Sequence, residues 1–275
     1  MPQDRTLLYA GRGFEVAHVR LHAPQGPVWS DLYTVASPRV VFPIGRTRLD
    51  VRSGDDTWLT DALTAIRFGD ATAYRLRPET AAVRHSLVVS GHASVGPTHG
   101  ASTTGVSVCL MTPQALYRMH AARRQLPDTD GTQAATLVAS LVAYLAGAPH
   151  QAPWHGAVAR ARQLLLSEGS GPGTRVLSLD ELAEAVSRSP FHLARRFRQQ
   201  TGLSLHQYRQ HLRLASAMER LADGERDLAG LAHDLGYCSQ SHLGAVFRQA
   251  VGVTLGDARR VLGPAGTGAS ASARI

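Results

Sequence analysis

The stretch LAEAVSRSPFHLARRFRQQTGLSL, residues 182–205, recurs in outline as LAHDLGYCSQSHLGAVFRQAVGVTL, residues 231–255. Seven residues of the first copy recur fifty positions later, whereas matches nearer the start, such as Leu182 with Leu231, lie forty-nine positions apart. One residue is therefore inserted in the turn of the second copy, and a length change in a turn leaves both flanking helices intact. The recurring residues are His192, Leu193, Phe197, Arg198, Gln199, Gly202 and Leu205, matched by His242, Leu243, Phe247, Arg248, Gln249, Gly252 and Leu255.

Each copy predicts a helix, a turn and a second helix. In the first copy, Leu182, Ala183 and Val186 follow helical spacing and form one apolar face. The chain then restarts at Ser189, whose side chain is suited to accept a backbone N–H bond as an N-cap. Pro190 suits the first helical position, because the N–H group that it lacks would have had no partner within the helix.

The second helix of the first copy has two distinct faces. At about 100° per residue, Leu193 and Phe197 point inward, while Phe191, Arg195 and Arg198 gather on the opposite face. Guanidinium groups and an aromatic ring suit guanine edges, phosphates and a thymine methyl group. A solvated charged face is the alternative for a single arginine-rich helix, but its repetition in a second unit favours a helix that lies in the major groove.

Several motifs in register resemble the DNA-binding domain of the AraC/XylS transcription regulators, over about residues 154–260 or about 40% of the chain. The resemblance implies two helix–turn–helix units joined by a rigid helix over about residues 204–221, with both second helices in successive major grooves. The motifs are SLDELA (178–183), SPFHLARRFR (189–198), TGLSLHQY (201–208), RLASA (213–217) and LGYCSQSHL (235–243).

The resemblance and the helical periodicity together indicate which residues contact DNA. Base contacts are implied for the outward residues of both second helices, and backbone contacts for the start of each helix and its trailing arginine. The expected DNA-binding residues are Ser189, Phe191, His192, Ala194, Arg195 and Arg198 in the first unit, with Ser239, Gln240, Ser241, His242, Ala245 and Arg248 in the second.

Two departures from the family pattern predict that the two units are unequal. Gly244 and Ala245 stand where the family usually has a small polar residue followed by arginine. Ser187 stands in the first turn where glycine is usual, so the backbone there is strained if the turn needs left-handed geometry. We therefore expect the first unit to read sequence, and the second to hold the DNA backbone through Arg248 and the start of its second helix.

The N-terminal part of the chain predicts a different, β-rich fold. Short runs without helical periodicity alternate with turn-forming clusters, as in a small barrel or jelly roll. The segments VVFPIG (40–45) and AIRFGDATAYRL (65–76) resemble the cupin-like sensor domain of the same family. The expected strands lie within residues 28–35, 39–44, 48–51, 63–68, 85–89 and 106–111.

The fold class expected is α+β, with four successive parts. These are a cupin-like β-barrel sensor domain over residues 1–112, a helical dimerisation segment over 113–148, an all-α double helix–turn–helix domain over 154–262 and a disordered tail over 263–275. A short linker is expected at about 148–154 and a flexible loop at 169–173. In the helical segment, the stripe of Leu137, Val138, Leu141, Val142 and Leu145 fits packing on the barrel or a dimer interface, and the family resemblance favours the dimer.

Composition and cysteine spacing indicate the partner class and the cellular location of the protein. The net charge of +8 over 275 residues suits a nucleic-acid partner, and no apolar run is long enough to span a bilayer or to serve as a secretory signal. Cys109 and Cys238 lie too far apart to suggest a disulfide framework, so we expect a cytoplasmic protein, with Cys238 as a small half-buried residue rather than a redox switch.

We expect neither a metal nor another cofactor. The histidines of the N-terminal part lack a tight pair with ligand spacing followed by a glutamate. Those histidines are His18, His22, His85, His92, His99 and His120. An enzyme domain fused to the DNA-binding unit, as in relatives that repair alkylated DNA, would need a cysteine-rich metal site that the chain does not have.

The sequence therefore predicts a homodimeric transcription regulator, not an enzyme. Its expected partners are double-stranded promoter DNA, RNA polymerase and a small-molecule effector that would shift the population of sensor conformations. Control by a protein partner in place of a small ligand remains the alternative.

Overall fold

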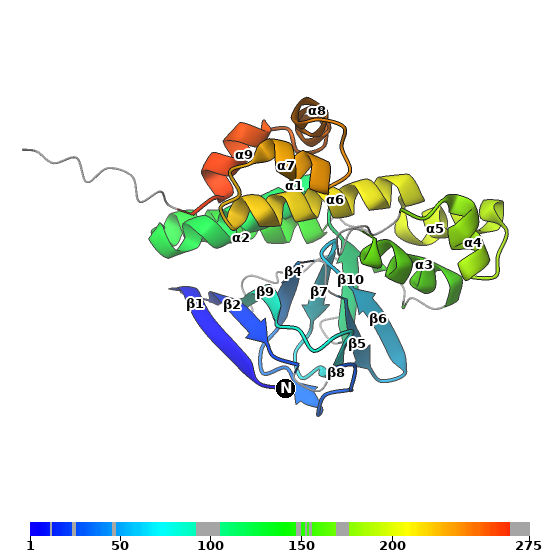
Figure 1. The fold of residues 1–275 in the computed structure, drawn as a ribbon. Helices are drawn as coiled ribbons and strands as arrows, with labels where there is room; N and C mark the ends of the chain where they lie inside the picture. Colours follow the sequence, from blue (N-terminus) through cyan, green and yellow to red (C-terminus); the bar gives the residue numbers. More distant parts are fainter. Residues whose placement is uncertain are drawn as a thin grey trace, which may run out of the picture.

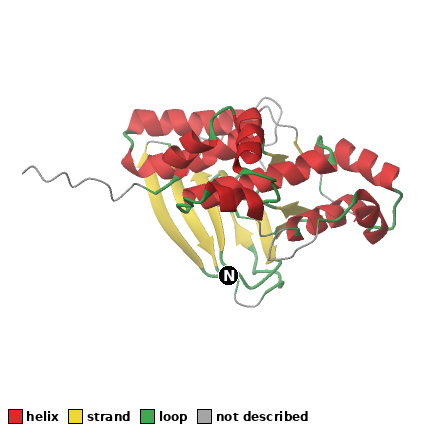
Figure 2. Ribbon diagram, turned by 45° about the horizontal axis from the view of Figure 1, so that its top comes forward, coloured by secondary structure: helices red, strands yellow, loops and turns green. Residues whose placement is uncertain are grey.

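The computed structural model describes residues 1–11, 13–23, 26–45, 48–91, 105–146, 150–151, 153, 156–168 and 176–264. Two antiparallel sheets form the N-terminal part, and the helices lie together above one side of them (Figures 1 and 2). The predicted combination of an N-terminal sheet domain and a C-terminal helical domain is confirmed.

Among the described residues, the larger sheet has seven strands and the smaller has four, and every pairing is antiparallel. The larger sheet has the order β1 (Gln3–Gly11), β2 (Phe14–Leu21), β9 (Arg84–Ser90), β4 (Arg39–Ile44), β7 (Thr64–Phe68), β10 (Val106–Leu110) and β11 (His150–Gln151). The smaller sheet has the order β3 (Tyr33–Thr34), β8 (Ala73–Pro78), β5 (Leu49–Ser53) and β6 (Asp56–Thr60).

The sequence predicted only some of the strands. Five of the six runs contain a strand of matching position, namely β4, β5, β7, β9 and β10, whereas the run 28–35 contributes only the two residues of β3. Strands β1, β2, β6 and β8 were not expected, nor was β11, which lies in the segment expected to be a linker. The long strand β1 lies at the sheet edge and is mostly exposed, so its sequence carries no buried alternation.

The middle of the larger sheet is buried on both faces. One face meets the smaller sheet in a core that joins Ile66 and Phe68 of β7 to Trp58 of β6 and Leu76 of β8. The other face packs against the helices in a continuous apolar cluster that reaches the last helix. Strand β7 is accordingly buried at every residue, and the sheet domain and the helical domain share one core.

The helical segment after the sheets folds against its own chain. It comprises α1 (Pro113–Gln125), a short 3-10 turn (Leu126–Asp128) and α2 (Gly131–Ala146). Val138, Leu141, Val142 and Leu145 of the apolar stripe are buried within this single chain, which favours packing over pairing as their role. Helix α1 packs against α6 (Leu205–Ala222), α8 (Gln240–Val251) and α9 (Leu255–Leu262).

Helix α6 crosses the helical domain and separates two groups of helices (Figure 1). It corresponds to the rigid helix expected at about residues 204–221, and Ser204 and Gln207 cap its start reciprocally. The helices of the domain are α3 (Gly156–Ser167), α4 (Leu179–Ala185), α5 (Pro190–Thr201), α6 (Leu205–Ala222), α7 (Leu228–Asp234), α8 (Gln240–Val251) and α9 (Leu255–Leu262).

His120 in α1 gives the fold a predicted pH dependence. Burial lowers the pKa of His120 to about 3, so the folded chain keeps the ring neutral. An unfolded histidine titrates at about pH 6.5, so the unfolded state binds the proton first and stability is lost as pH falls below that value. When the pH is lowered from 7.5 to 5.5, His120 should therefore reduce the unfolding free energy of the wild type by about 1.4 kcal/mol.

Urea unfolding at the two pH values measures this loss. The variant His120→Leu should show a smaller loss by that amount, whereas His206→Leu, at an exposed position on α6, should keep the wild-type pH dependence. Equal pH dependence in the wild type and His120→Leu would show that His120 does not carry the effect.

Candidate nucleic-acid interface

The first helix pair, α4 and α5, is fixed by local chemistry. Ser178 and Glu181 form a reciprocal capping box at the start of α4. Ser189 caps α5 by accepting the backbone N–H of His192, and Pro190 occupies the first helical position, as the sequence predicted. Helix α5 ends at Gly202, which adopts the left-handed conformation of a helix C-cap.

The second pair, α7 and α8, repeats this arrangement. Asp227 caps α7 by accepting the backbone N–H groups of Ala229 and Gly230, and Ser239 caps α8 by accepting that of His242. Helix α8 ends at Gly252, which is also left-handed. The two pairs therefore begin and end their second helices in the same way.

The turns of the two pairs differ by one residue, and the inserted residue is Cys238. The backbone N–H of Arg188 bonds to the carbonyl of Ala183, and the N–H of Tyr237 bonds equivalently to Ala232, so the turns stay in register up to that point. Cys238 then precedes the cap of α8. The thiol is exposed, so the expectation of a half-buried residue was wrong.

The outer face of α5 forms one wall of a concave surface. Leu193 and Phe197 are fully buried, as predicted, whereas 77% of Phe191 is exposed. A groove of about 480 Å³ runs along α5 between the first turns of α4 and α6, and Phe191, Ala194, Arg195 and Arg198 line it. The structure therefore brings together four of the six residues predicted for the first unit, while Ser189 and His192 are not among its lining residues.

Sequence reasoning missed the residues that α4 and α6 contribute to this groove. Leu179, His206 and Arg209 line it as well, and the capping motif at Ser204 was the available signal for His206 because it locates a helix start. Arg209 also binds the Glu168 carboxylate, with an Nε–Oε2 distance of 2.6 Å, so its charge is largely balanced within the protein.

The second unit exposes shorter side chains. Gln240, Ser241, Ala245 and Arg248 are exposed on α8. His242 is exposed too, but its Nδ1 lies 3.2 Å from the Sγ of Cys238. Its ring also meets the buried Tyr237 ring edge-on, with a centroid distance of 5.3 Å. A Cβ atom added at Gly244 would meet no atom within 4 Å, so glycine is not required there by close packing.

The histidines once considered as metal ligands are dispersed or engaged elsewhere. The rings of His18 and His85 stack and lie 3.1 Å apart at their nearest nitrogens, and His22 bonds to Asp4. His92 and His99 lie outside the described residues. In the described part of the chain, no three His, Cys, Asp or Glu residues come together as metal ligands would. Within the same part, no helix has the length and apolarity to cross a membrane.

Comparison with known proteins identifies the family. A helix-turn-helix domain model matches residues 182–261. The regulatory protein SoxS of Salmonella typhimurium is 36% identical over 86 residues, which are 31% of this chain and 80% of SoxS. The chain belongs to the AraC/XylS family.

A second relative matches over a smaller share of its own length, and a solved structure aligns with most of the chain at low identity. A putative AraC-like transcription regulator of Streptomyces antibioticus is 35% identical over 80 residues, which are 29% of this chain and only 26% of that protein. The solved structure of unsaturated fatty acid bound ToxT from Vibrio cholerae aligns with 92% of this chain and 96% of its own, with 10% identity and a TM-score of 0.37.

Ser187 in the first turn gives a stability prediction with a matched control. Its φ of +53° lies in the left-handed region, and the equivalent Gly236 of the second unit has a φ of +76°. A side chain makes this conformation costly, so Ser187→Gly should raise the unfolding free energy by about 0.5–1 kcal/mol. Gly236→Ser should lower the unfolding free energy by a similar amount, because serine would have to adopt the same left-handed backbone. The new Cβ adds no clash, since its nearest contact, with Arg213, is an ordinary 3.4 Å.

Thermal and urea unfolding of both variants test this expectation. Destabilisation by Ser187→Gly would show that the serine side chain makes contacts worth more than the strain of its backbone.

Proposed function

We propose that the protein is a DNA-binding transcription regulator that reads two successive major grooves with α5 and α8. The observation that carries this proposal is the concave face of α5, where Phe191, Arg195 and Arg198 line one groove beside two helix starts. Exposed guanidinium groups on a capped helix suit guanine edges and phosphates, and helix N-termini attract phosphates. Helix α8, which repeats α5 and is capped in the same way, would be the second helix to enter a major groove.

The two units have different roles in this proposal. The first unit specifies sequence through Phe191, Ala194 and Arg195, whereas the second, with Gly244 and Ala245 at its centre, contacts mainly the backbone through Arg248 and the start of α8. The Ser189 and Ser239 hydroxyls accept backbone N–H groups as caps, and each keeps a hydrogen to donate to a phosphate.

Two substitutions separate base reading from backbone binding. Arg195→Ala should cost about 1–3 kcal/mol on the preferred duplex and relax the preference at one base position. Arg248→Ala should weaken binding to all duplexes about equally and reduce the slope of log K against log salt by about one. Arg160→Ala is the matched control, because it removes an exposed arginine on α3 that does not line the groove.

The probe is a duplex enriched from a random library by the purified full chain, with Kd values read by fluorescence anisotropy at several salt concentrations. Enrichment of no duplex would refute sequence-specific binding. A second half-site more sensitive to base changes than the first would refute the assignment of roles.

We further propose that the N-terminal domain is a cupin-like sensor for a small organic anion with an apolar body. A cavity of about 330 Å³ lies between the two sheets, and Val19, Ile66, Phe68 and Leu76 contribute apolar wall. Arg39 also lines it, and its buried Nε has no hydrogen-bond partner among the described residues. Arg5 and Glu15 line the cavity too, but they pair with each other. The unpaired Nε–H of Arg39, beside the apolar wall, therefore favours a carboxylate over a neutral ligand.

A matched pair of ligands tests this assignment. Octanoate should raise the melting temperature of the chain more than octanol does, and Arg39→Gln should abolish the difference, because Arg39 supplies the positive charge that favours a carboxylate over a hydroxyl group. Arg52→Gln, whose guanidinium stacks over the Trp29 ring at 4.3 Å, should leave it unchanged. Equal shifts with both ligands would refute an anion site, and no shift with either would favour control by a protein partner.

The remaining partners of the proposal are a second copy of the chain and RNA polymerase. Because the apolar stripe of α2 is buried within the chain, pairing would use the outward face of α2, where Ala135, Thr136, Ala139 and Ser140 are exposed and small. Sedimentation velocity of the DNA complex gives the number of chains bound, and a single chain on the full duplex would refute the dimer.

A further inference from the structure

Three polar side chains from distant parts of the chain meet in a site without solvent exposure. Asp61 lies in the turn between β6 and β7, Arg162 in α3 and Tyr208 in α6, and both Asp61 and Arg162 have 0% exposed side chains. Arg162 Nη2 lies 2.6 Å from Asp61 Oδ2, and Arg162 Nε donates to the Tyr208 hydroxyl oxygen at 2.7 Å. The Tyr208 hydroxyl in turn donates to the same Oδ2 of Asp61.

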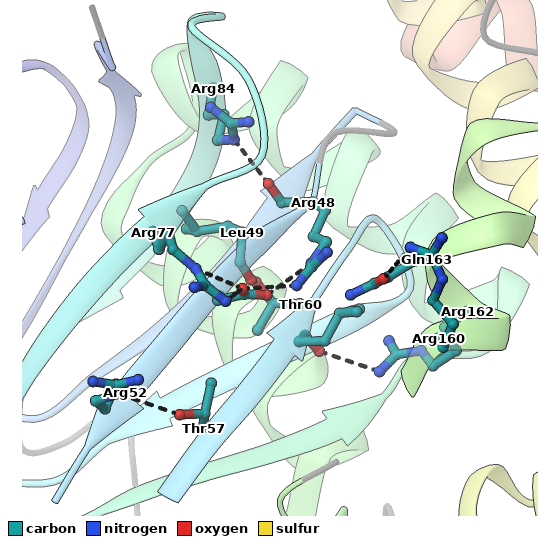
Figure 3. Close-up of polar contacts among 12 residues, drawn as sticks. Arg48, Leu49, Arg52, Thr57, Thr60, Arg77, Arg84, Arg160, Arg162 and Gln163 are labelled. Atoms are coloured by element: carbon teal, nitrogen blue, oxygen red, sulfur yellow. Dashed lines mark hydrogen bonds and ion pairs between the residues drawn. The ribbon is translucent and has the colours of Figure 1, made fainter. Parts of the chain in front are cut away.

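The carboxylate at the centre of this network is held in place by its own turn. The backbone N–H of Leu63 donates to Asp61 Oδ1 at 2.9 Å. The Thr64 hydroxyl accepts from the backbone N–H of Asp61 and donates to the backbone carbonyl of Asp61. Arg162 also reaches the carbonyl of Leu59 at the end of β6, with an Nη1–O distance of 3.2 Å (Figure 3). The sheet therefore presents a rigid acceptor set to α3 and α6.

The network connects directly to the proposed reading helix. The Tyr208 ring packs edge-on against Phe197, with a centroid distance of 5.3 Å and an interplanar angle of 87°. Phe197 is the fully buried inward residue of α5, on the turn that carries Arg195 and Arg198 outward. Helix α3 packs on α4 and α5 as well, so Arg162 and Tyr208 both hold the first unit.

The second unit is held by different contacts. Helix α1 packs against α6, α8 and α9, and α6, which carries Tyr208, also packs against α9. Asp61, Arg162 and Tyr208 themselves lie outside α7, α8 and α9, so α1 still holds the second unit when the network is lost. Loss of the network would therefore loosen the first unit relative to the second and leave the second in place.

We propose that Asp61 is a positioning residue for DNA reading: by fixing Arg162 and Tyr208, it sets the first unit at the distance and angle from the second that one duplex requires. This inference rests on the proposed function. When the two units are already fixed relative to each other, binding a duplex with both half-sites does not cost the entropy of orienting one unit against the other. Binding to a single half-site gains nothing from this fixed arrangement.

The test compares Asp61→Asn with Asp50→Asn in the full chain. Asp50 is also a buried carboxylate between two arginines, with 2.8 Å to Arg48 and 2.7 Å to Arg77, but its partners belong to the sheet domain and none lies on a helix (Figure 3). The probes are the duplex enriched by the wild type and two shortened duplexes, each of which retains one of its halves.

Asp61→Asn should raise the Kd for the full duplex tenfold or more and change the Kd for either half by less than twofold. Asp50→Asn should leave all three Kd values within twofold of the wild type. Tyr208→Phe, which keeps the ring against Phe197 and removes only the hydroxyl, should shift the full-duplex Kd in the same direction, and it carries the test if Asp61→Asn does not fold.

Three results would overturn the inference. They are equal full-duplex Kd values for Asp61→Asn and Asp50→Asn, an equal loss on the full and half duplexes by a folded Asp61→Asn variant, and a wild-type full-duplex Kd for Tyr208→Phe where Asp61→Asn is unfolded. Failure of the wild type to enrich any duplex would instead refute the proposed function itself.

Discussion

The buried contact of Asp61 with Arg162 and Tyr208 constrains how the two halves of the molecule meet. Burying two charges is tolerated only when their partners are placed with good geometry, and here one carboxylate oxygen serves both a guanidinium and a hydroxyl. The apolar core shared by the sheet and the helices is extensive, but apolar contact is non-directional and permits small displacements. The directional bonds of this network select one of those arrangements.

The helical domain was largely predictable because its signals are local. The caps at Ser178, Ser189 and Ser204 each lie within three residues of the N–H group that they bind, so the sequence displays both partners together. The inward pair of Leu193 and Phe197 follows from helical periodicity alone. The surface on which these helices would contact DNA could therefore be outlined before the structure. The capping motif at Ser204 locates the start of α6, but only the packing of the helices shows that α4 and α6 line the groove.

The sheet domain was less predictable because its partners are distant in sequence. Strand β8 does alternate, with Tyr74 and Leu76 inward, but it is short and its alternation resembles that of many loops. Asp61 lies 101 positions from Arg162 and 147 from Tyr208, and no pattern in the sequence relates the three. From the sequence alone, Arg162 would be predicted to be an exposed arginine of an amphipathic helix. Only the packing of the sheet against α3 shows that it is buried.

The position of Asp61 also bears on how the proposed sensor domain would act on the DNA-binding helices. Strand β7 lines the cavity between the sheets with Ile66 and Phe68, and it begins three residues after Asp61, to whose backbone its first residue, Thr64, is bonded. A ligand changes an equilibrium only through different interactions in the two states. A cavity ligand that favours one placement of β7 also favours one placement of Asp61, and hence of Tyr208 and α5. Strand β7, which would contact the ligand, and the turn that holds Asp61 are thus continuous in the chain and joined by hydrogen bonds.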